Sequence, residues 1–145
     1  MSSRVASLLF ATALALPAMA QSPAAKPPAI QMAPARYTSP ASGSEMYQSY
    51  CATCHGSKGL GDGPAKGSLK HAVPDLTSLA KRNKGTFPKD QVSQVIRGEA
   101  RAETHSLQDM PVWGPVFRSL NSSQEPVVRM RVANLTKYIE SLQAK

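Results

Sequence analysis

The chain contains few cysteines, few aromatic residues and few acidic side chains. Its 145 residues include two cysteines, one tryptophan, and nine Asp and Glu against 17 Lys and Arg, which gives a formal net charge of +8. A structural zinc site takes four ligands, and the two cysteines have no second C-x-x-C pair to complete such a set. The basic residues are spread along the chain without interleaved aromatics, so nucleic-acid binding is not indicated. The basic balance favours acidic partners or an anionic surface.

After its first 20 residues the chain has no long hydrophobic run. Arg4 is the only charged residue before Lys26, residues 5–16 are almost all apolar, and Ala-Met-Ala follows at 18–20. This order is typical of a secretory signal with its cleavage site, and the apolar run is shorter than the roughly 18 to 20 residues that span a bilayer. We therefore predict a signal peptide over 1–20, a periplasmic location and no membrane span after cleavage. An uncleaved signal would act as an N-terminal membrane anchor.

The segment 21–42 is rich in Pro, Ala and Ser and has few large apolar residues. This composition predicts a disordered tether, although a few of its residues could pack onto the domain. The remainder, 43–145, has the length of a single domain.

The stretch "CATCHGSKGLGDGP" at 51–64 places both cysteines three residues apart and a histidine directly after them. A disulfide between Cys51 and Cys54 would close a very small loop and stabilise the fold little. Such pairs are usually redox-active, metal-binding or haem-binding. A thioredoxin-like dithiol needs a βαβ context, and no β-branched strand precedes Cys51. Covalent haem is favoured, because in C-x-x-C-H each thiol bonds one vinyl group and His55 then ligates the iron.

Four glycines, Gly56, Gly59, Gly61 and Gly63, follow His55 within eight residues. Glycine adopts positive φ angles and allows close backbone approach, so we predict a tight turn after the histidine. A phosphate-binding loop is a poorer interpretation, because no strand precedes it and the G-x-G-x-x-G spacing is absent.

With "PDL" at 74–76 and "MPVWG" at 110–114 following that motif, the chain resembles the class I c-type cytochromes. Within that family it is most similar to small bacterial single-haem members with a G-x-G-D-G-P loop and a Met-Pro motif. The resemblance covers about 43–142. It implies an all-α cytochrome c fold, with three to five short helices wrapped around one covalently attached haem c.

Three stretches of the sequence predict helices. Gly43, Tyr47 and Cys51 are spaced i, i+4, i+8 and share one face of a helix that leads into the C-x-x-C-H. A second helix is predicted over 88–97, with a proline at its start and a glycine after its end. The C-terminal helix has one apolar stripe: Val128, Val132, Leu135, Ile139 and Leu142. By resemblance, the two terminal helices cross at four residues: Gly43, Tyr47, Leu135 and Tyr138.

The second axial ligand of the iron has several candidates in the sequence: Met46, Met110, Met130, His71 and His105. Met46 and Met130 fall within predicted helices and are expected to be packing residues. The match to the family's Met-Pro makes Met110 the predicted ligand. His105 is the alternative, and His71 or an open site stays possible.

The resemblance also implies supporting roles for two residues. Pro74 matches the proline whose carbonyl accepts a hydrogen bond from Nδ1–H of the proximal histidine, which would orient His55. Trp113 is expected either to pack near a haem edge or propionate, or to fill the core.

The resemblance implies an electron carrier rather than an enzyme. Iron would cycle between ferrous and ferric states and exchange single electrons with redox partners. Basic residues after the haem motif could steer an acidic partner: Lys58, Lys66, Lys70, Lys81, Arg82, Lys84 and Lys89. The protein would be a monomer or, alternatively, the haem subunit of a larger periplasmic dehydrogenase or oxidase complex. A haem sensor or enzyme with an open distal site is a further alternative.

Overall fold

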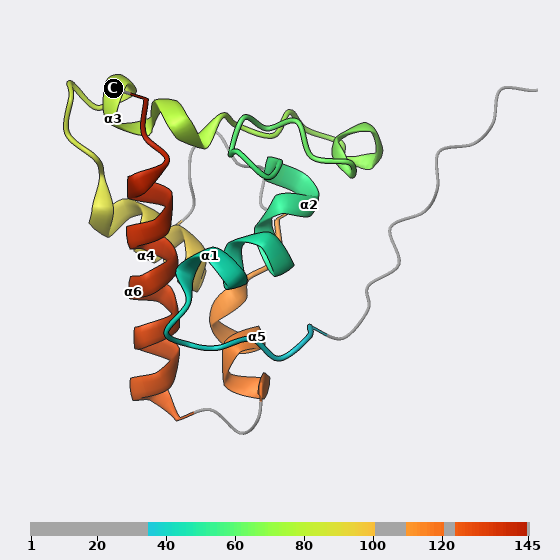
Figure 1. Cartoon of the computed structure of the whole chain (residues 1–145), viewed down its shortest axis with the longest axis vertical. Helices are drawn as coiled ribbons and strands as arrows, with labels where there is room; N and C mark the ends of the chain where they lie inside the picture. Colours follow the sequence, from blue (N-terminus) through green and yellow to red (C-terminus); the bar gives the residue numbers. More distant parts are fainter. Residues whose placement is uncertain (1–34, 101–109, 121–123, 145) are drawn as a thin grey trace, which may run out of the picture.

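The computed structural model describes residues 35–100, 110–120 and 124–144, whose helices surround one hydrophobic core (Figure 1). Its elements in chain order are α1 (Gly43–Met46), the π-helical turn η1 (Tyr47–Cys51), α2 (Ala52–His55), the 3₁₀ turns η2 (Lys66–Ser68) and η3 (Leu76–Ser78), α3 (Leu79–Arg82), α4 (Lys89–Arg97), α5 (Trp113–Ser119) and α6 (Glu125–Ser141). The described ranges contain no β-strand. The prediction of an all-α fold is therefore confirmed.

The first helical stretch runs without a break from α1 through η1 into α2. Ser42 caps its start, because its side-chain oxygen accepts a hydrogen bond from the backbone N–H of Glu45 at 3.2 Å. The predicted helix into the C-x-x-C-H is confirmed. It widens into a π-helical turn that ends at Cys51, the first residue of the motif. The i, i+4 spacing does not reveal this turn, and such turns are frequent at functional sites.

The predicted crossing of the terminal helices is confirmed. A Cβ on Gly43 would lie 2.1 Å from the backbone oxygen of Asn134 in α6, so the two backbones touch at a point that only glycine allows. Beside this contact, the rings of Tyr47 and Tyr138 pack with their centroids 5.1 Å apart. Leu135, the remaining residue of the predicted crossing, is buried.

Among the described elements, the helix α6 is the longest, with 17 residues. Its predicted apolar stripe faces the core: Val128, Val132, Leu135 and Ile139 are buried, and Leu142 is half-buried at the C-cap. The expectation that Met130 packs is wrong, because its side chain is 41% exposed, whereas Met46 is fully buried as expected. In the part of the chain that the structure describes, no helix is long and apolar enough to cross a membrane.

The predicted helix over 88–97 is confirmed as α4. It begins after Pro88 and ends at Gly98, whose φ of 79° gives the left-handed cap that glycine favours. Ile96 is its buried residue, and α4 packs along α6.

Residues 35–42, the last part of the predicted tether, lie against the domain, as the prediction allowed for a few of its residues. Thr38 is buried, and its hydroxyl lies 2.7 Å from the hydroxyl of Tyr50. The guanidinium of Arg131 donates to the Thr38 hydroxyl at 3.1 Å. The folded unit therefore begins before the expected boundary. Its first residues satisfy polar groups that would otherwise be buried without hydrogen bonds.

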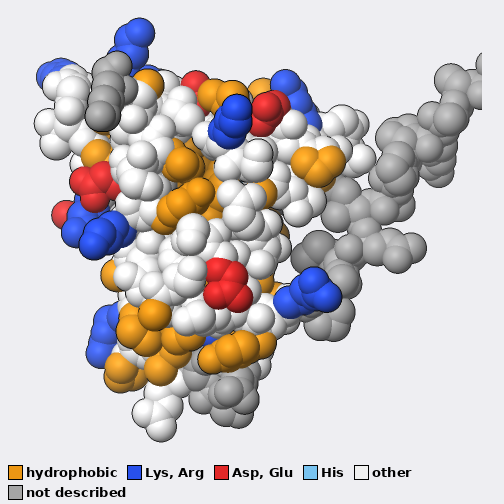
Figure 2. All heavy atoms as spheres, viewed as in Figure 1, with side chains coloured by type: hydrophobic (Ala, Val, Ile, Leu, Met, Phe, Trp, Pro, Cys, Tyr) orange, Lys and Arg blue, Asp and Glu red, His pale blue; other side chains and the backbone are white. Residues whose placement is uncertain are grey.

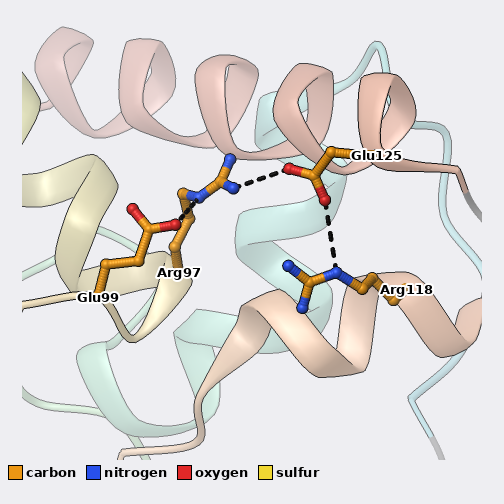
Figure 3. Close-up of polar contacts among 4 residues, drawn as sticks. All are labelled: Arg97, Glu99, Arg118 and Glu125. Atoms are coloured by element: carbon orange, nitrogen blue, oxygen red, sulfur yellow. Dashed lines mark hydrogen bonds and ion pairs between the residues drawn. The ribbon is translucent and has the colours of Figure 1, made fainter.

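An ion-pair network joins the ends of three helices (Figure 3). Arg97, the last residue of α4, lies 2.6 Å from Glu99 and 2.8 Å from Glu125 at the start of α6. Arg118 of α5 lies 3.4 Å from the other oxygen of Glu125. The hydrogen bond from Arg97 lowers the pKa of the Glu125 carboxyl below its ordinary value.

Candidate functional site

A cavity of about 460 Å³ lies between the C-x-x-C-H helix, the segment that follows it, α4 and the start of α5. The structure brings all six site residues predicted from the sequence to its wall: Cys51, Cys54, His55, Pro74, Met110 and Trp113. The volume falls within the roughly 300–1,000 Å³ of cofactor and ligand sites, and most of the lining is apolar. Residues more than 60 positions apart in the sequence therefore share one site.

The two cysteines stand on consecutive turns of the same helical stretch. Cys51 ends η1, and Cys54 with His55 ends α2. No disulfide joins the cysteines. Burial, together with the neighbouring Cys54, raises the pKa of the Cys51 thiol to about 12. A redox dithiol depends on a lowered thiol pKa, and the raised pKa of Cys51 does not fit that role.

The glycine loop fixes the end of α2. Backbone N–H groups of Gly61 and Gly63 donate to the carbonyls of His55 and Cys54, at 2.9 and 3.2 Å, and so satisfy acceptors that a helix end leaves open. A Cβ on Gly63 would lie 2.4 Å from the carbonyl oxygen of Thr53. The predicted tight turn is confirmed, and it holds the backbone that carries the histidine. His55 itself is buried, with 7% of its surface exposed.

The same loop carries the segment around Pro74 to the cavity. A Cβ on Gly61, whose φ is 75°, would lie 2.4 Å from the carbonyl oxygen of Val73. The backbone N–H of Leu76 donates to the carbonyl of Gly59 at 2.7 Å. Pro74 therefore lines the cavity, and its hydrogen bond with the histidine stays a prediction.

Met110 and Trp113 reach the cavity from the start of α5. Met110 is half-buried two residues before the N-cap of the helix, and Trp113, its first residue, is 9% exposed. Trp113 packs on Tyr50 and Phe117, with ring centroids 5.2 and 5.7 Å away. Trp113 therefore both lines the cavity and belongs to the core. The sequence predicts these two positions as alternatives.

The other candidates for the second axial position have different surroundings. Met46 is in the core, where its sulfur lies 3.7 Å from the guanidinium of Arg131, and Met130 is exposed. His71 lines the cavity but is exposed at its mouth. His105 lies outside the described residues. Among the methionines that the structure describes, Met110 is the one that lines the cavity.

Sequence reasoning missed much of the lining. The additional residues are partly apolar side chains of η3, α3 and α4 and partly polar groups: Tyr50, Leu76, Leu79, Arg82, Asn83, Gln91, Val92, Val95 and Ile96. The apolar positions of α4 could be found from its periodicity, because they form its inward face. The segment 76–83 carries no comparable signal, since its turns are too short to show a period.

A C-x-x-C-H at a helix end, closed by a glycine loop and facing a methionine-bearing segment across an apolar cavity, is the arrangement of a class I c-type cytochrome. The chain belongs to the family described as cytochrome C oxidase, cbb3-type, subunit III, whose model matches residues 38–119, more than half of its length. No curated protein and no solved structure gives a significant match. The match begins within the packed segment 35–42. The domain is therefore a haem-c-binding domain for electron transfer.

Proposed function

We propose that the domain binds one haem c through thioether bonds to Cys51 and Cys54, with His55 and Met110 as axial ligands. It then carries single electrons between partner proteins in the periplasm. The observation that carries the proposal is the convergence of these four side chains on one mainly apolar cavity. When bound, the haem iron supplies a one-electron couple between its ferrous and ferric states.

The residues of the chain set the environment of that couple. The helix end and the glycine loop hold the backbone of His55 in place. Met110 offers a soft, neutral thioether, which favours ferrous iron relative to a more basic ligand. The apolar walls from α3 and α4 exclude water from the cavity and so raise the cost of the more charged ferric state.

Basic side chains near the cavity support the proposal that the redox partner has an acidic surface. Four exposed basic residues are sequence neighbours of residues that line the cavity. Lys70 lies between Leu69 and His71, Arg82 and Lys84 flank Asn83, and Lys89 follows Pro88. Figure 2 shows Lys and Arg side chains at several places on the upper half of one face, with some Asp and Glu side chains among them. Such charges speed association with an acidic surface. Because exposed charges are screened over about 10 Å at 0.1 M salt, the association rate should fall as salt rises.

A second candidate function is that of a haem subunit within a larger oxidase or dehydrogenase complex. The description of the matching family, which names an oxidase subunit, supports this alternative. Purification of the native protein under mild conditions distinguishes the two. A free carrier elutes alone, and a subunit elutes with its complex.

The experiment that tests the proposal combines a redox titration with carbon monoxide binding. The wild-type protein should titrate as a single one-electron couple, and its reduced form should not bind carbon monoxide at neutral pH without denaturant. Met110→Ala should open the axial position, and its reduced form should bind carbon monoxide. Met130→Ala, which removes an exposed methionine, is the matched control and should stay closed. Carbon monoxide binding by the wild type would overturn the carrier and favour a sensor or enzyme with an open site.

A further inference from the structure

One wall of the cavity is a short and weakly supported segment. Residues 76–82, the turn η3 and the helix α3, contribute Leu76, Leu79 and Arg82 to the lining. A helix of four residues is far shorter than the roughly 12 to 15 residues at which isolated helices become stable. The position of this wall therefore depends on contacts with the rest of the fold.

The residues that follow the C-cap of α6 supply several of those contacts, in addition to the bond from Leu76 to Gly59. The side-chain carbonyl of Gln143 accepts a hydrogen bond from the backbone N–H of Ala80 at 2.9 Å. Its amide group donates to the backbone carbonyls of Leu76 at 2.8 Å and Ile139 at 2.9 Å. The backbone N–H of Ala144 donates to the carbonyl of Thr77, also at 2.9 Å.

These bonds join parts of the chain that are far apart in sequence. Gln143 lies 63 positions from Ala80 and 67 from Leu76. Figure 1 shows the C-terminal end beside α3, at the end of the molecule where the segment after α2 crosses over. Ile139, to which the amide is also bonded, itself lines the cavity.

A glutamine suits this position because one side chain carries both an acceptor and two donors. Ala80 is the second residue of α3, so its N–H has no partner within that helix. The amide oxygen satisfies it, and the amide nitrogen ties the preceding turn to α6. A carboxylate could replace only the first of these bonds, since an ionised carboxylate has no donor.

We propose that Gln143 is a positioning residue that keeps the wall 76–82 closed against the haem and so sets the reduction potential. This inference rests on the proposed function. Without the hydrogen bonds of Gln143, the wall separates from α6 and water reaches the cavity. Greater solvent access stabilises the more charged ferric state and lowers the potential.

The test uses the haem-loaded protein and three variants. Gln143→Met keeps the length of the side chain and removes both donor and acceptor. Gln143→Glu keeps the acceptor for Ala80 and removes the donor. Asn134→Ala is the matched control, because it removes another side-chain bond of α6, the 2.9 Å bond from Asn134 to the carbonyl of Pro40. The measurements are the midpoint potential, the thermal midpoint and the amide hydrogen exchange of Ala80.

We expect Gln143→Met to lower the ratio of ferrous to ferric protein at a fixed ambient potential about threefold, which is about 28 mV for a one-electron couple. Its Ala80 amide should exchange faster than in the wild type. Gln143→Glu removes the donor and places a carboxylate oxygen against the carbonyls of Leu76 and Ile139, so it should also lower the potential. Asn134→Ala should leave the potential unchanged even where it lowers the thermal midpoint.

Two results would overturn the inference while leaving the proposed function intact. One is an unmoved potential in Gln143→Met with a normal haem spectrum, and the other is an equal fall in Asn134→Ala. If Gln143→Met does not fold, an unmoved potential in Gln143→Glu with a normal haem spectrum serves as the refuting result. A wild-type protein without attached haem would instead overturn the proposed function.

Discussion

The contact between α1 and α6 at Gly43 leads to a prediction in which two effects oppose each other. In Gly43→Ala the new Cβ would lie 2.1 Å from the backbone oxygen of Asn134 and 3.0 Å from the Cβ of Tyr138. Atoms of these types do not approach closer than about 3 Å, so the helices must separate by about 1 Å. The oxygen belongs to the backbone of α6 and cannot rotate away.

The magnitudes decide the sign of the change in stability. Alanine favours a helix over glycine by about 0.5–1 kcal/mol. Overpacking of a tight contact costs about 1–3 kcal/mol, and the backbone obstruction at Asn134 places this site at the upper end. We therefore expect a net loss of about 2 kcal/mol. For a domain of this size that is a fall of about 8–16 °C in the thermal midpoint.

The assay is thermal unfolding followed by circular dichroism at equal haem content. Gly67→Ala is the matched control, because a Cβ there meets no atom within 4 Å, and we expect its stability to change by less than about 0.5 kcal/mol. A Gly43→Ala protein as stable as the wild type would refute the reasoning. It would show that the helices are not in contact at this residue.

Three further predictions concern charge and cofactor. Because its hydrogen bond to Arg97 lowers the pKa of Glu125 below the ordinary 4.5, its stabilising contribution is present above pH 4.5 and is lost as the pH falls through the lowered value. The gap in thermal midpoint between wild type and Glu125→Gln should therefore shrink from pH 6 to pH 3, and a constant gap would contradict the ion pair. Arg131 is fully buried, and its Nε and Nη2 have no hydrogen-bond partner among the described residues. Burial of a charge without an ion pair is costly, so urea unfolding should show Arg131→Met to be within about 1 kcal/mol of the wild type or more stable. A loss well beyond that would show that the bond of Arg131 to Thr38 and its contacts with the Tyr37 and Phe117 rings outweigh that cost. A domain this small has a limited core without haem, so the double variant Cys51→Ala with Cys54→Ala should give a largely unfolded chain by circular dichroism, and a cooperative thermal transition in it would be the contrary result.

The features that the sequence predicts well are those with local signals. The apolar stripe of α6 repeats with the helical period, and α4 is bounded by Pro88 and Gly98, so both helices could be located from the sequence. The C-x-x-C-H and its glycines lie within 14 residues, and the motif with its sequence context favours haem. In each case the residues that carry the signal are neighbours in the chain.

The features that the sequence does not predict depend on contacts between distant residues. Residues 35–42 pack because Tyr50 and Arg131 need hydrogen-bond partners, and neither need is visible in a Pro- and Ser-rich segment. The bonds of Gln143 to the wall of the cavity likewise span more than 60 positions. The exposure of Met130 shows the opposite error, because a helical methionine was expected to pack although it lies outside the apolar stripe.

The most direct test of the central claim is the visible absorption spectrum of the purified mature protein, reduced and oxidised. The account predicts a sharp α-band in the reduced protein, and in the oxidised protein the weak band near the red end of the range that reports thioether ligation of ferric iron. Covalent haem without that band would contradict the role of Met110. A protein without haem, produced in a host able to attach it, would contradict the account as a whole.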